Sequence, residues 1–72
     1  MFVVSKNGYD VFNLNLYCRV SCYNRFVEAK LPNLNIEAIL GNYFSPERAN
    51  EVFKDLLRAL ENGEKFYRMP KE

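Results

Sequence analysis

The sequence predicts a small α+β domain, in which an antiparallel β-meander of about four or five strands, plus a short C-terminal strand, packs against one amphipathic α-helix. Three observations predict this class. Apolar and polar residues alternate through most of the first half, apolar residues recur at helical spacing from 49 to 60, and signals for a helix start and stop flank that stretch. A chain of 72 residues holds one small core, so residues 1–72 are expected to form a single domain.

The N-terminal part is predicted to form three strands. Phe2-Val3-Val4 reads as the first, and Asn7-Gly8 after it is the pair that favours a type I′ hairpin turn. Side chains then alternate between two faces from Tyr9 to Tyr23, a run longer than the usual strand of about 5–6 residues. A break or bulge near Asn13 to Asn15 is therefore expected to divide this run into two strands.

Two further strands are expected before the helix. Asn24-Arg25 is a predicted turn, and the strand after it covers Phe26 to Leu31 and is ended by Pro32-Asn33. The segment from Leu34 to Leu40 alternates and is predicted to be a strand that Gly41 ends. Its second half is also compatible with a helix, so both possibilities stay open there.

The helix is predicted from about Pro46 to Asn62. Ser45 can accept a hydrogen bond from a free first-turn N–H, and proline suits the first helical position because it has no N–H. Gly63 can take the left-handed conformation that closes a helix. The apolar stripe expected to face the core consists of Ala49, Val52, Phe53, Leu56, Leu57 and Leu60.

The ends of the helix are flanked by predicted packing elements. Tyr43 and Phe44 before it are expected to be core residues, and Phe66 to Met69 after it is expected to be a short edge strand. Pro70 ends this strand, because proline cannot donate to a β-ladder.

Composition limits the classes of partner. With 49% apolar and 15% aromatic residues, the chain has more apolar surface than a small core needs, which predicts a second apolar surface and a homo-oligomer. The net charge is +1 without a basic stripe, so duplex nucleic acid is not an expected partner. The chain has neither an apolar run of about 18 residues nor a secretory signal pattern, so no membrane association and a cytoplasmic location are expected.

The residues that carry chemistry are sparse. The chain has no histidine, the commonest general base, and its glycines are isolated, so neither catalysis nor a phosphate loop is predicted. Cys18 and Cys22 would lie roughly 13 Å apart on a strand, too far for a disulfide, and are expected to be reduced, buried thiols. No metal site and no cofactor are predicted.

Tyrosine and arginine residues are the candidate binding residues. Tyr17, Arg19, Tyr23 and Arg25 occupy alternate positions, so they project together from an extended chain and suit a protein interface or a nucleotide-like ligand. The favoured alternative is that the tyrosines pack under the meander or at a homodimer seam. A further candidate is Arg48, which could assist an anion near the helix N-terminus, although an ion pair with Glu51 is the favoured role. Tyr67 and Arg68 are the last two candidates, and the same alternatives apply to them.

The motifs in the second half carry a family resemblance. Leu40-Gly41-Asn42-Tyr43, then Glu47-Arg48-Ala49 with Val52, and the C-terminal Tyr67-Arg68-Met69-Pro70 resemble short, mostly uncharacterised proteins of Gram-positive bacteria and their phages or prophages. Val3-Val4-Ser5 matches the start of that pattern.

The resemblance implies a functional class rather than catalytic residues. It implies a non-enzymatic phage-type protein in the cytoplasm of a bacterial host, whose expected role is anti-defence. Such a protein would sequester a nucleotide-derived immune signal or block a host defence protein through the Tyr/Arg surface. The alternative is a structural or regulatory homo-oligomeric interaction module.

Overall fold

The computed structural model describes residues 1–32 and 37–72 and confirms the α+β class. Its elements in chain order are β1 (Phe2–Val4), β2 (Val11–Asn13), the 3-10 helix η1 (Leu14–Leu16), β3 (Arg19–Tyr23), β4 (Phe26–Lys30), β5 (Glu37–Asn42), α1 (Pro46–Glu61) and β6 (Phe66–Arg68).

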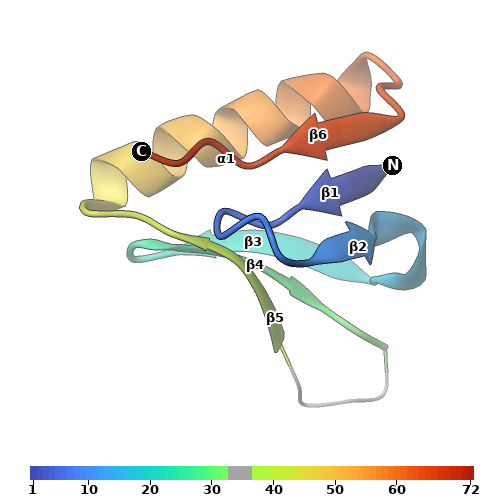
Figure 1. Ribbon diagram of the computed structural model, residues 1–72, viewed down its shortest axis with the longest axis horizontal. Coiled ribbons are helices and arrows are strands. Elements are labelled where there is room, and N and C mark those ends of the chain that lie inside the picture. Colours follow the sequence, from blue (N-terminus) through green and yellow to red (C-terminus); the bar gives the residue numbers. More distant parts are fainter. Residues whose placement is uncertain (33–36) are drawn as a thin grey trace.

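The strands form two three-stranded sheets rather than one continuous meander. The orders are β2-β1-β6 and β3-β4-β5, and β6 runs parallel to β1 whereas the other neighbours are antiparallel. Figure 1 shows α1 lying above the β3-β4-β5 sheet, with β6 returning beside the helix towards β1. The helix thus acts as the crossover that makes a parallel neighbour possible. A main-chain hydrogen bond of 2.8 Å from Lys6 N–H to the Leu40 carbonyl links the two sheets.

The expected break in the long alternating run is confirmed. It falls at η1, where the Asn13 side chain accepts a hydrogen bond of 3.1 Å from the Asn15 N–H. A side chain that satisfies a nearby N–H in this way offers the backbone an alternative to a continuing strand. The break also turns Leu14 into the core.

The first hairpin is confirmed, but its predicted turn type is wrong. A type I′ turn needs positive φ at both central residues, whereas Gly8 has φ +81° and Asn7 is not among the positive-φ residues. The turn is wider and closes through side chains: Asn7 Oδ1 accepts from Ser5 Oγ at 2.6 Å and from Tyr9 N–H at 2.8 Å. Ser5 is buried, so its hydroxyl fixes the turn from inside. The second predicted turn, at Asn24-Arg25, joins β3 to β4, with Asn24 at φ 53°.

The segment before the helix is a strand where it is described, and Gly41 lies inside this strand rather than ending it. The first three residues of the predicted strand, Leu34, Asn35 and Ile36, lie outside the described residues. Gly41 is required here by packing, because a Cβ at this position would lie 2.7 Å from Cε2 of Tyr43. The register with β4 shifts between Val27 and Glu28 in the same place, which is a β-bulge.

The helix prediction is confirmed, and Ser45 Oγ accepts a hydrogen bond of 3.1 Å from Arg48 N–H as the cap. Only part of the predicted stripe is core. Ala49, Val52 and Leu56 are buried and Phe53 is partly buried, whereas Leu57 and Leu60 are 38% and 39% exposed. The prediction that these last two leucines face the core is wrong.

Geometry explains the two exposed leucines. A helix of 16 residues is about 24 Å long, and the five-residue strands β3 and β4 that it contacts are only about 17 Å long. The sheet therefore cannot cover the whole stripe along the helix axis, which leaves Leu60 exposed near the helix end. Leu57 directly follows the completely buried Leu56 and is exposed because its side chain is turned by about 100° around the helix axis.

Tyr43 is the largest fully buried side chain, whereas Phe44 is 71% exposed, so the prediction of a core role holds for the first and is wrong for the second. The Tyr43 hydroxyl donates a hydrogen bond of 2.7 Å to the Pro70 carbonyl. The Lys6 ammonium lies 4.7 Å from the centre of its ring. Tyr43 thereby ties the C-terminal segment to β5.

We expect the free energy of unfolding to fall in alkaline solution because of Tyr43. Burial raises the pKa of Tyr43 from 10.0 to about 12, so above pH 10 the unfolded chain loses this proton before the folded chain does. Stability should be constant up to about pH 9 and decline between about pH 10 and 12. Urea unfolding followed at a series of pH values tests this, and Tyr43→Phe should make the decline smaller without abolishing it, because the raised pKa of Tyr67 contributes in the same direction. A decline of equal size in Tyr43→Phe would show that another group causes it.

Candidate binding surfaces

The seven candidate residues from the sequence do not form one surface. Arg19 and Tyr23 are exposed on one face of β3, and Arg25 lies in the turn that follows. Tyr17 is half-buried and packs edge-to-face on Phe12, with the ring centres 6.2 Å apart. The packing alternative therefore describes Tyr17, whereas Arg19 and Tyr23 are accessible. The other three candidates lie on α1 and β6.

Arg48 and Tyr67 hold elements of the fold together. Arg48 pairs with Glu51 at 3.4 Å, as the sequence favours, and also donates a hydrogen bond to the main-chain oxygen of Glu72. The Tyr67 hydroxyl donates a hydrogen bond of 2.8 Å to Asp55 Oδ2 and so links β6 to α1. Burial, and then this hydrogen bond, raise the pKa of Tyr67 above its ordinary value, which keeps the hydroxyl a donor.

A half-exposed apolar surface covers one side of the β2-β1-β6 sheet. Cross-strand pairing places Phe2 beside Phe66 and Val4 between Val11 and Arg68, all on the same side. Phe2, Phe66 and Val11 are 45%, 51% and 58% exposed. We call this the Phe2–Phe66 face, and it consists of Phe2, Val4, Val11, Asn13, Phe66 and Arg68.

The arrangement within the Phe2–Phe66 face is close-packed. The two phenylalanine rings lie 6.2 Å apart, and the Arg68 guanidinium lies 5.9 Å from the Phe66 ring centre. Val4, on the same side of the sheet, is buried. The other side of the same sheet carries Val3, which is fully buried in the core. One side of this sheet thus packs in the core, and the other side exposes apolar groups to solvent.

A second surface is centred on Ile39 of β5, which is 46% exposed. A hollow of about 460 Å³ on one side is lined by Ile39, Tyr23, Phe26, Glu28 and Glu37. A hollow of about 590 Å³ is also lined by Ile39, and its polar lining includes Lys6, Asn7, Asn42 and Lys71. We call these the acidic hollow and the basic hollow, and together with Ile39 they make up the Ile39 surface.

The acidic hollow brings two carboxylates together. Burial, and then the neighbouring Glu37 carboxylate, raise the pKa of Glu28, and Arg19 on the adjacent strand partly opposes the rise. Two adjacent acids without a bound cation destabilise each other's charged form. A cationic group that reaches this hollow would therefore be bound favourably.

The cysteines differ from their expected burial. Both are free thiols, but Cys18 is exposed and Cys22 is only half-buried, so the prediction of buried thiols is wrong. Cys18 lies outside β3, where its side chain reaches the Lys30 carbonyl at 3.5 Å. Burial, and then the Glu28 charge, raise the pKa of Cys22, which keeps this thiol protonated and a weak nucleophile.

Across residues 1–32 and 37–72, no three His, Cys, Asp or Glu side chains are grouped so that they could hold a metal ion. Over the same residues, no helix combines the length and the apolar character needed to cross a membrane.

Comparison of the chain with models of protein families, with curated proteins and with solved structures finds no match. The Phe2–Phe66 face and the Ile39 surface are therefore the two candidate binding surfaces of this protein. Sequence patterns did not locate the first of these, because alternating strand residues do not reveal which side of a sheet the helix covers. The high apolar content was the signal that such a surface exists.

Proposed function

We propose that this protein is a non-enzymatic binding protein whose Phe2–Phe66 face docks on one host protein. The observation that carries the proposal is the exposure of Phe2, Phe66 and Val11 together on an uncovered side of a sheet. Contiguous exposed apolar groups on a small protein mark interaction sites. The resemblance to short proteins of Gram-positive bacteria and their phages supports an anti-defence or host-modulating role in the host cytoplasm.

The face has the composition of an interface centre. Aromatic rings and arginine dominate binding energy at protein interfaces, and full burial of one phenylalanine side chain contributes about 1.5–3 kcal/mol. Phe2 and Phe66 are each about half exposed, so burial of their exposed halves by a partner would contribute part of this free energy to binding. Because Arg68 is the charged member of the face, the partner should present apolar side chains and a carboxylate.

A protein partner fits this face better than a nucleotide-derived signal does. A nucleotide carries phosphate groups that need several donors or cations, and the face supplies one arginine. Apolar contact area is what the face offers, and another protein can cover it. We therefore favour blocking of a host protein over sequestration of a nucleotide signal.

Replacing both phenylalanines should abolish partner binding and leave the fold intact. In Phe2→Ser/Phe66→Ser, two half-exposed rings are lost, while the buried core keeps its residues. Tagged protein expressed in a Gram-positive host should retain one stoichiometric host protein in native mass spectrometry, and the double variant should lose it. Arg68→Glu, which keeps the apolar rings, should weaken the same complex at least tenfold.

Tyr9→Ser is the matched control, because Tyr9 is an aromatic residue 90% exposed in the β1–β2 turn, outside the face. It should leave the complex unchanged, and circular dichroism should show native spectra for all variants. Retention of the host protein by a folded Phe2→Ser/Phe66→Ser variant would refute the proposal. A thermal shift with a nucleotide and none with a partner would favour the sequestration role instead.

A further inference from the structure

Ile39 is an apolar ridge between two hollows of opposite charge. It lines both the acidic hollow and the basic hollow, so the two adjoin along β5. Nearly half of its surface is exposed at this central position. The surface therefore has an apolar centre with carboxylates to one side and ammonium groups to the other.

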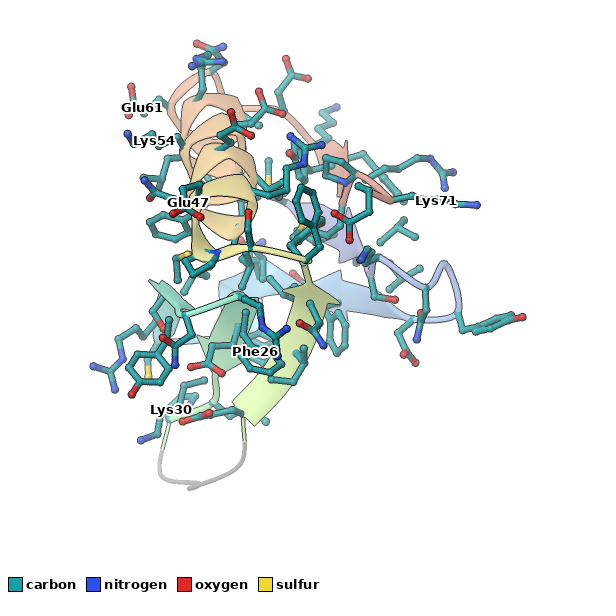
Figure 2. The ribbon with its side chains drawn as sticks, turned by 90° about the vertical axis from the view of Figure 1, so that its left-hand side faces the viewer. Phe26, Lys30, Glu47, Lys54, Glu61 and Lys71 are labelled. Atoms are coloured by element: carbon teal, nitrogen blue, oxygen red, sulfur yellow. The ribbon has the colours of Figure 1, made fainter. Side chains whose placement is uncertain are left out.

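Three of the charges on the two sides, those of Glu28, Glu37 and Lys71, are available for binding, whereas Lys6 is paired with Glu72. Ion pairs among the described residues join Lys6 to Glu72, Arg48 to Glu51 and Arg58 to Asp55, and none engages Glu28, Glu37 or Lys71. Figure 2 shows the Lys71 side chain extending away from the body of the molecule. Arg19 and Lys30 lie on the same sheet face as these carboxylates, with Lys30 directly across from Glu37, but neither cation forms an ion pair with Glu28 or Glu37.

Such a surface is complementary to itself. In a two-fold symmetric interface every contact occurs twice: residue i of the first copy contacts residue j of the second, and residue j of the first copy contacts residue i of the second. A rotation by 180° about an axis near Ile39 exchanges the two sides of the ridge. It would bring the basic side of each copy to the acidic side of the other.

We infer that the Ile39 surface binds a second copy of this protein, with Ile39 at the centre and the Lys71 ammonium of each copy facing Glu37 and Glu28 of the other. The occupant is a second copy because both halves of the required charge pattern are present on one chain. The net charge of +1 adds little general repulsion between copies. This dimer uses a different surface from the Phe2–Phe66 face, so each face stays free for its own partner.

Charge exchange tests the dimer. Wild-type protein should sediment as a dimer in analytical ultracentrifugation, and Glu37→Lys or Lys71→Glu alone should weaken dimerisation at least tenfold, because each creates two like-charge contacts. An equimolar mixture of the two variants should form a heterodimer. In one of its two contacts Lys71 of the first variant meets Glu37 of the second, as in the wild type. In the other contact the new lysine at position 37 meets the new glutamate at position 71, so the two charges are exchanged but still opposite. The double variant Glu37→Lys/Lys71→Glu should also recover a dimer.

Glu61→Lys is the control, because it makes the same charge change at an exposed position at the end of α1 (Figure 2). It should dimerise like the wild type. A monomeric wild type, a dimer unaffected by Glu37→Lys, or a folded mixture that fails to associate would each overturn the inference. Phe2→Ser/Phe66→Ser should remain dimeric, so failure of this inference and failure of the proposed function are distinguishable.

Discussion

Replacing Leu56 with alanine should lower the free energy of unfolding by about 2–5 kcal/mol. Leu56 is completely buried on the face of α1 that packs on the sheets, together with Val52 and Ala49. Truncation removes buried methyl groups and leaves a cavity that a core of this size cannot fill by relaxing. Urea unfolding at neutral pH measures the loss.

Leu60→Ala is the matched comparison, since it removes the same atoms from a side chain 39% exposed on the same helix. Its cost should be at most about 1 kcal/mol, because much of the side chain is already in water. Equal losses for Leu56→Ala and Leu60→Ala would mean that the helix packs along the whole apolar stripe, as the sequence pattern alone predicts.

Gly41→Ala should destabilise the protein by about 1–3 kcal/mol, although alanine is normally harmless in a strand interior. The added Cβ would lie 2.7 Å from Cε2 of Tyr43, and Tyr43 is 2% exposed, so the ring has little room to move. Displacing it also strains the hydrogen bond from its hydroxyl to Pro70. Thermal or urea unfolding gives the change in stability.

A double-mutant cycle shows whether the ring causes this cost. In a Tyr43→Leu background the clash is absent, so adding Gly41→Ala should cost much less than it does in the wild type. Additive losses would place the cause of the destabilisation in the backbone of β5 rather than in the close contact with Tyr43.

Local signals predicted the elements that depend on local chemistry. Ser45 and Pro46 fix the start of α1 because the cap and the missing N–H act within one turn. The break at η1 was predictable for the same reason, since Asn13 competes for a nearby backbone N–H. Strand pairing of β3 with β4 followed from the short Asn24-Arg25 turn.

Features that depend on tertiary packing were not predictable. The parallel pairing of β6 with β1 joins the two ends of the chain, and no spacing in the sequence specifies it. Gly41 resembles a strand terminator until the Tyr43 ring is seen against it. Phe44 carries an apolar side chain next to the core residue Tyr43 and is nevertheless exposed.

The candidate site was only partly predictable for a similar reason. Alternation placed Arg19 and Tyr23 correctly on one exposed strand face, and Tyr23 lines the acidic hollow. Alternation could not show that Tyr17 turns inward at η1. It also could not bring together Lys6, Ile39 and Lys71, which lie far apart in the sequence and line one hollow.

The two proposed surfaces would reinforce each other. A dimer formed through Ile39 carries two Phe2–Phe66 faces, so a host protein with two or more identical subunits could be bound twice by one dimer. The second contact would then be intramolecular, and the apparent affinity would exceed that of one face. Charge variants at Glu37 that dissociate the dimer should therefore also weaken binding to an oligomeric target.

Site-specific photo-crosslinking in the host cell tests the binding role most directly. A photoreactive phenylalanine analogue placed at position 66 should crosslink one host protein, and the same analogue at the exposed position 9 should not. Crosslinks to a single host protein at 66 alone are the predicted result. Equal crosslinking at both positions, or crosslinks at 66 only to another copy of this chain, would contradict the account.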